Sequence, residues 1–149
     1  MIVIRDINLS AGVTDKVNEH LEELERFNGV LVKLKGYSLE DFLADKDIEA
    51  HAERSLHGAL EAAMSIGEEL ITVSGGKLPV TYEAVFNMLG DREIIATDLA
   101  KRLRRLEDFH NILIHGQIEN WEDVYDQLGR ADDFQEFVRE IRDYLSKRA

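Results

Sequence analysis

Apolar residues recur every three or four positions along most of this chain, which is the spacing of one face of an α-helix. Ser38, Thr81 and Asn120 are residue types that favour helix starts, and Gly36 and Gly116 favour helix ends. The pattern predicts helices over residues 14–34, 38–43, 47–73, 81–89, 97–115, 121–128 and 132–147. We therefore expect an all-α protein, an up-and-down bundle of about four to five main helices joined by short loops.

The length of 149 residues suits one domain, which we expect to span residues 1–149. Ile2, Ile4 and Ile7 alternate with other residues as in a short β-strand, so we expect residues 1–12 to form a small N-terminal appendage. The chain has no cysteine, which excludes disulfides and thiolate chemistry and suits a reducing cytosol. No stretch has the apolar length of a signal peptide or a membrane span, so we expect a cytoplasmic protein that does not enter membranes.

The net charge of −12 argues against broad, sequence-independent binding to nucleic acid, because neutralising phosphates supplies most of such affinity. Local charge differs from the total, since Lys101, Arg102, Arg104 and Arg105 form a dense basic cluster. This basic cluster has two interpretations that the sequence leaves open. It is either a surface that binds RNA phosphates, or a set of cations that interact with helix carbonyls and improve solubility.

Two histidines, His110 and His115, follow the basic cluster at the end of the helix predicted over residues 97–115. At about 100° per residue, His110 falls on the apolar face of this helix. That face also carries Leu99, Leu103, Leu106 and Leu113. We therefore expect His110 to be buried or at an interface, with its ring nitrogens satisfied by a neighbour.

His115 falls on the opposite, polar face of the same predicted helix, together with Arg104, Asp108 and Asn111. Asn111 lies one turn before His115 and can orient its imidazole, while Asp108 can pair with Arg104. The last turn of a helix also favours the protonated ring, which suits acid–base chemistry. The alternative is that these residues are an ordinary solvated helix face.

Other chemical motifs are absent from the sequence. A di-metal carboxylate bundle needs two Glu-x-x-His pairs, and only Glu107 and His110 have this spacing, with Glu107 off the apolar face. The chain has no P-loop, dinucleotide fingerprint or nucleophile elbow. His51 and His57 fall on different faces of one helix, where we expect surface or boundary positions. We therefore expect neither a metal nor a cofactor.

The sequence contains several short motifs, here called phrases, whose order and spacing together are specific, although each one alone is weak evidence for a family. They are residues 37–45, 52–56 and 60–63, then Pro79, Tyr82, Phe86 and Leu89, and most clearly residues 99–128 with Ala100-Lys101-Arg102-Leu103 and Asn111-Ile112-Leu113-Ile114-His115-Gly116. In this order the chain resembles the HepT-like proteins of the HEPN superfamily. These are small helical ribonuclease toxins encoded beside a minimal nucleotidyltransferase antitoxin.

The resemblance implies an active motif of arginine, usually followed by asparagine, then after a few residues histidine, one spacer and tyrosine. Asn111 and His115 match it, whereas His110 holds the arginine position and Gln117 the tyrosine position. In the family, the histidine transfers protons at the ribose 2′-hydroxyl and the arginine stabilises the transition state without a metal. The tyrosine is adenylylated by the partner, and Gln117 has no phenolic oxygen to accept that group.

The resemblance also implies an obligate dimer, in which the motifs of the two chains meet in a shared cleft. His110 and His115 are about 140° apart on a regular helix. Both can therefore contact one phosphate only if the helix unwinds near Gly116 or a second subunit supplies one of the two histidines. Ile112, on the outward side of the apolar stripe, supports a partner surface. We therefore expect a homodimer with an RNA substrate and a nucleotidyltransferase antitoxin as further partners.

Three hypotheses for function stay open at this point. The first is a HepT-like toxin that acts as a metal-independent endoribonuclease, with protonated His110, or Arg104 or Arg105, replacing the arginine. The second is a catalytically inactive dimeric HEPN binding module that docks a nucleotidyltransferase or a nucleotide. The third is a helical protein in which both histidines are purely structural. The candidate catalytic residues are His115, His110 and Asn111, and the candidate RNA-binding residues are the basic cluster.

Overall fold

The computed structural model describes residues 9–75 and 77–148, and over these residues the chain is helical with connecting turns and no β-strand. The elements are α1 (Ala11–Leu34), α2 (Leu39–Ala44), α3 (Lys46–Val73), α4 (Tyr82–Asp91), α5 (Thr97–Arg104), α6 (Glu107–His115), α7 (Trp121–Gln127), the 3-10 turn η2 (Leu128–Arg130) and α8 (Ala131–Ser146). The predicted all-α class is confirmed. The strand expected at Ile2, Ile4 and Ile7 lies outside the described residues, and Ala11 and Gly12 belong to α1.

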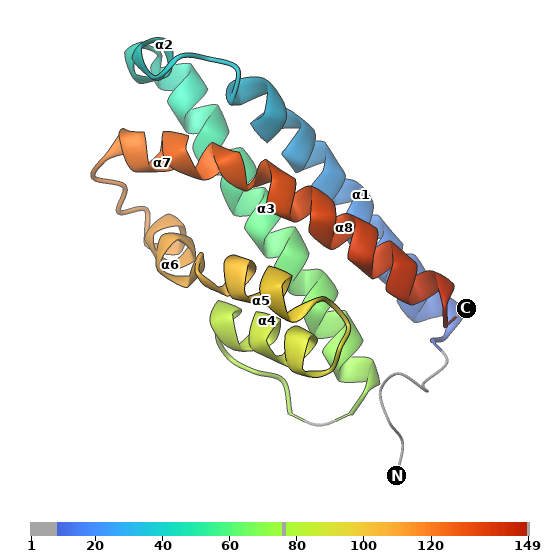
Figure 1. Cartoon of the computed structure of the whole chain (residues 1–149). Helices are drawn as coiled ribbons and strands as arrows, with labels where there is room; N and C mark the ends of the chain where they lie inside the picture. Colours follow the sequence, from blue (N-terminus) through green and yellow to red (C-terminus); the bar gives the residue numbers. More distant parts are fainter. Residues whose placement is uncertain (1–8, 76, 149) are drawn as a thin grey trace.

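Three long helices, α1, α3 and α8, form the body of the molecule, and α1 packs against both of the others (Figure 1). The short helices α4 and α5 pack against each other beside the C-terminal part of α3, whereas α2 and α7 contact its other end. Helix α6 lies between these two groups and contacts both α3 and α4. No helix in the described part of the chain has the length and hydrophobicity needed to cross a lipid bilayer.

The buried apolar residues of all these helices form one cluster, as the amphipathic pattern predicts. In α1 the buried stripe includes Leu21, Leu24 and Leu31, and it is interrupted by Asn28. The Nδ2 atom of Asn28 donates a hydrogen bond to the carbonyl of Ala131 at 3.0 Å, which offsets part of the cost of burying an amide. This bond joins α1 to the first residue of α8.

The predicted starts of three helices are confirmed by side-chain caps. The side-chain oxygens of Ser38, Thr81 and Asn120 each accept a hydrogen bond from a first-turn N–H. The first helix begins at Ala11 rather than near Thr14, because Ser10 accepts the N–H of Val13 at 3.2 Å. The cap at Ser10 was not foreseen.

The single helix predicted over residues 97–115 is wrong, since two helices meet there at a turn. Helix α5 ends at Arg104 and α6 begins at Glu107, while the N–H of Leu106 donates to the carbonyl of Leu103 at 3.1 Å. The Oε2 atom of Glu107 accepts the N–H of Glu83 at 2.6 Å, so the start of α6 also satisfies the start of α4. Residues before and after the turn therefore no longer share one helix face.

Candidate active site around His110 and His115

His110 is buried between three helices, with 4% of its surface exposed. Its Nε2 atom lies 2.6 Å from Oε1 of Glu61 on α3. Its ring stacks on that of Tyr82 on α4, with ring centroids 4.9 Å apart and an interplanar angle of 28°. The expectation of a buried histidine with a satisfied nitrogen is confirmed.

Tyr82, which stacks on the imidazole of His110, is itself buried. Burial raises the pKa of its phenol well above the usual value, and the negative charge of Glu107 adds to this effect. Within the described part of the chain, its buried hydroxyl has no hydrogen-bond partner. Tyr82 therefore contacts His110 as a neutral aromatic ring and does not supply a charge.

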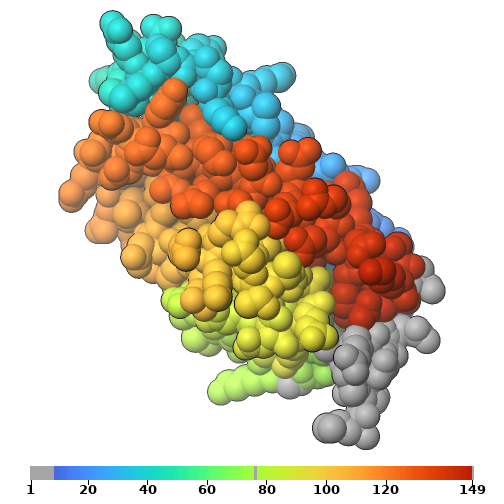
Figure 2. Space-filling model, in the orientation of Figure 1, coloured from blue at the N-terminus to red at the C-terminus, as the bar shows by residue number. Residues whose placement is uncertain are grey.

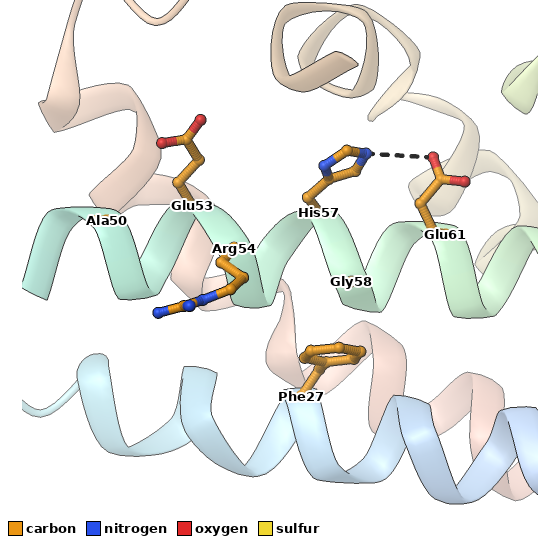
Figure 3. Close-up of a pocket in the computed structure, with 7 residues that line it drawn as sticks. All are labelled: Phe27, Ala50, Glu53, Arg54, His57, Gly58 and Glu61. Carbon is orange, nitrogen blue, oxygen red and sulfur yellow. Dashed lines mark ion pairs between the residues drawn. The ribbon is translucent and has the colours of Figure 1, made fainter. Parts of the chain in front are cut away.

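A second histidine, His57 of α3, shares the same carboxylate. Its Nε2 atom lies 3.5 Å from Oε1 of Glu61, and Figure 3 shows the two side chains pointing toward each other along α3. The rings of His57 and His110 meet edge to face, with centroids 6.4 Å apart. His57 lies at the boundary of the core, as expected, with its side chain 40% exposed. Its contact with Glu61 was not predicted, although two residues one helical turn apart lie on the same face of a helix.

His57 and Glu61 also line an open groove between α1 and α3. The groove has a volume of about 420 Å³ and is lined by Phe27, Ala50, Glu53, Arg54, His57, Gly58 and Glu61 (Figure 3). In Figure 3, Glu53 and His57 project from one side of α3, whereas Arg54 turns toward α1. Glu61 therefore contacts both this groove and the buried imidazole of His110.

His115 and Asn111 lie on the surface of α6, one turn apart. Helix α6 stays regular through His115 and ends at Gly116, whose positive φ of 64° favours glycine. His110 is buried while His115 is exposed, so one chain does not bring both histidines to one ligand. Their side chains therefore converge neither by unwinding of the helix nor by proximity within this chain.

In the basic cluster, Arg102 and Arg104 bind other side chains of the fold, whereas Lys101 and Arg105 are exposed. Arg102 binds Asp98, Asp133 and Glu136, with 2.7 Å between its Nη2 and Oε2 of Glu136. The hydrogen bonds to Glu136 and Asp133 raise the pKa of Arg102 above its usual value. The contacts with Asp133 and Glu136 join α5 to α8, which adjoin on the face seen in Figure 2.

Arg104 is also engaged within the fold, because its Nη1 atom donates to Oδ1 of Asn87 at 2.9 Å. The pairing with Asp108 that the continuous helix suggested is replaced by this contact with α4. Lys101 and Arg105, in contrast, are exposed. The solvent-facing charge of the cluster therefore lies mainly on Lys101 and Arg105.

Another pocket, of about 320 Å³, lies between α6 and α7. It is lined by Phe109, Ile112, Gln117, Ile118, Glu119, Asn120, Asp123 and Val124. Ile112 is 39% exposed and Ile114 is 50% exposed, so α6 presents apolar side chains to solvent next to His115. Among the residues that the structure describes, no group of three or more His, Cys, Asp or Glu could hold a metal ion.

This helical arrangement is similar to that of several solved structures. One is a tri-AMPylated HEPN toxin from Shewanella oneidensis in complex with MNT antitoxin, with a TM-score of 0.75, 19% identity, and coverage of 85% of this chain and 96% of that one. The arrangement is also similar to that of YutE from Bacillus subtilis, described as a cytosolic protein of unknown function, with a TM-score of 0.74, 18% identity, and coverage of 94% of each chain. At this identity the likeness shows the fold alone.

The sequence comparisons identify the family. The sequence model of the family described as "Ribonuclease HepT-like" matches residues 17–141. A relative, the tRNA nuclease HepT of Aphanizomenon flos-aquae (strain 2012/KM1/D3), is 27% identical over 132 residues, covering 87% of this chain and 89% of that protein. The chain belongs to the Ribonuclease HepT-like family, and the resemblance inferred from its short phrases is confirmed.

Proposed function

We propose that this protein is a HepT-like toxin that cleaves RNA without a metal and is paired with a nucleotidyltransferase antitoxin in the cytoplasm. The observation that carries the proposal is the exposed pair Asn111 and His115 at the end of α6, with the spacing of the family motif. A relative is named as a tRNA nuclease, and a neighbour in fold is a HEPN toxin in complex with MNT antitoxin. The proposal extends these properties to this chain.

In the proposed reaction, His115 takes the proton from a ribose 2′-hydroxyl or returns one to the leaving oxygen, and Asn111 orients it. Its exposure leaves room for an RNA strand. Lys101 and Arg105, the exposed residues of the basic cluster, bind the phosphates, while Arg102 and Arg104 add positive charge from positions fixed within the fold. The chain's own residues thus supply proton transfer and phosphate binding.

The proposal includes a homodimer in which the α6 helices of two chains lie near the two-fold axis. Ile112 and Ile114 are exposed beside His115, and a two-fold contact is a common way to cover such side chains. A dimer would also place two copies of His115 close together. This arrangement suits a site that one chain does not complete, because His110 faces the interior.

A second function is favoured by the position of His110. The family's arginine is replaced at this position by a buried imidazole that faces Glu61, so the fixed charge of a guanidinium is absent beside His115. Losing such a charge costs on the order of a hundredfold or more in rate. The alternative is therefore a catalytically inactive dimeric HEPN module that docks a nucleotidyltransferase or a nucleotide.

A cleavage assay with the purified protein and tRNA in the presence of EDTA tests the proposal. We expect slow cleavage that His115→Ala abolishes and His51→Ala leaves unchanged, because His51 is exposed on α3 away from the motif. Cleavage that survives His115→Ala would exclude this residue as the base. No cleavage by the wild-type protein would favour the inactive binding module.

A further inference from the structure

One carboxylate oxygen joins two imidazoles that come from different helices. The Oε1 atom of Glu61 lies 2.6 Å from Nε2 of His110 and 3.5 Å from Nε2 of His57. His110 is almost fully buried, whereas the side chain of Glu61 is 48% exposed and lines the groove between α1 and α3. Glu61 is thus the contact between a buried ring and an open groove.

The chemistry of a carboxylate decides which ring nitrogen carries hydrogen. An ionised carboxylate only accepts hydrogen bonds, so a neutral imidazole that bonds to it must carry its hydrogen on the facing nitrogen. For His110 this nitrogen is Nε2, and at 2.6 Å the bond is short enough to select that tautomer. The stack on Tyr82 holds the plane of the same ring.

We propose that Glu61 is the positioning residue for His110. It fixes the orientation and the Nε2–H tautomer of this imidazole. Where the reaction is concerned, this inference rests on the proposed function, because His110 occupies the motif position of the family's arginine. Glu61 acts through His110, since its carboxylate contacts the rings of His110 and His57 and is not seen to contact His115 in the described part of the chain.

Glu53 is the matched control for this role. It lies roughly two helical turns before Glu61 on α3 and lines the same groove. Its side chain carries the same charge, but it makes neither of the contacts that Glu61 makes with His57 and His110. Replacing either glutamate by glutamine removes one negative charge from the groove at nearly constant size.

The test is nitrogen NMR of the full-length protein labelled with ¹⁵N-histidine, at a pH where the rings are neutral. We expect His110 in the Nε2–H form in the wild-type protein, in Glu53→Gln and in His57→Asn. In Glu61→Gln, whose amide both donates and accepts, we expect a shift toward the Nδ1–H form while thermal unfolding stays cooperative. An Nδ1–H form of His110 in the wild-type protein would overturn the proposal, and this result does not depend on whether Glu61→Gln folds. An unchanged tautomer of His110 in folded Glu61→Gln would also overturn it.

A cleavage assay on the same variants separates this inference from the proposed function. If the wild-type protein cleaves RNA and His110 takes part in place of the family's arginine, we expect Glu61→Gln to lower kcat by roughly tenfold or more with little change in KM, by analogy with the carboxylates that orient metal-bound histidines. Glu53→Gln should keep the wild-type kcat. If the wild-type protein does not cleave RNA, the proposed function fails, while the NMR result still decides whether Glu61 positions His110.

Discussion

The guanidinium of Arg102 donates a hydrogen bond to the carboxylate of Glu136, with Nη2 and Oε2 2.7 Å apart across the contact between α5 and α8. Asp133 and Asp98 bind the same guanidinium. A residue of the basic cluster that the sequence offered for RNA binding thus links two helices of the fold. Its neighbour Arg105 is exposed and provides a direct comparison.

Arg102→Ala should destabilise the protein by about 1–2 kcal/mol, because it removes a cation that binds the partly buried carboxylates of Asp133 and Glu136. Arg105→Ala should stay within about 0.5 kcal/mol of the wild-type free energy of unfolding, as is usual for an exposed site. Urea unfolding followed by circular dichroism measures both values. Equal values for the two variants would show that the contacts of Arg102 with α8 contribute nothing to stability.

Gly58→Ala should destabilise the protein by about 1–3 kcal/mol, since overpacking a close helix contact forces neighbours to shift. A Cβ atom at position 58 would lie 2.5 Å from the ring of Phe27, where α1 and α3 meet. Gly29→Ala on α1 is the matched change, because a Cβ atom there has nothing within 4 Å. In a helix interior it should stabilise by roughly 0.5–1 kcal/mol. Thermal unfolding should therefore shift in opposite directions for the two variants.

Light scattering of the purified protein at micromolar concentration should give the mass of a dimer. Ile112→Asp should shift this mass to that of a monomer, because a carboxylate would be buried in the proposed two-fold contact. Val32→Asp is the control, since Val32 is 56% exposed on α1. A wild-type monomer would refute the dimer, and a dimer that survives Ile112→Asp would place the interface elsewhere.

Incubation with a cognate nucleotidyltransferase and ATP should leave residues 115–118 without an adenylyl group, because Gln117 has no phenolic oxygen. Gln117→Tyr should create the acceptor and gain the adduct at the exposed position 117. Peptide mass spectrometry reads both outcomes. An adduct on the wild-type peptide would contradict the prediction, and modification at Tyr125 on α7 would identify a different acceptor.

His110→Arg should increase RNA cleavage, on the order of a hundredfold where the missing charge limits the rate. The longer guanidinium can keep the bond to Glu61 and carry a fixed charge toward the surface of α6. The double variant His110→Arg, His115→Ala should remain inactive, because the base is still absent. An unchanged or lower rate in His110→Arg would show that position 110 does not perform the arginine's role in this chain.

Much of the fold and part of the site follow from the sequence. The helices, the caps at Ser38, Thr81 and Asn120 and the burial of His110 depend on residues within a few positions of one another, so a local pattern predicts them. The break between α5 and α6 was missed because neither glycine nor proline marks it. The roles of His115, Asn111 and the exposed basic residues stay predictions.

By itself, the sequence determined the all-α class, the family and the orientation of His110 toward the interior, because apolar periodicity and motif spacing are properties of one segment at a time. Only the tertiary structure decided that His110 meets Glu61 and Tyr82, and that Arg102 meets Glu136. An amphipathic pattern defines the buried face of a helix only to within about 100°. A hydrogen bond needs its donor and acceptor to be placed much more closely than that. Which partner each polar side chain finds was set by how α3, α4, α5, α6 and α8 pack against one another.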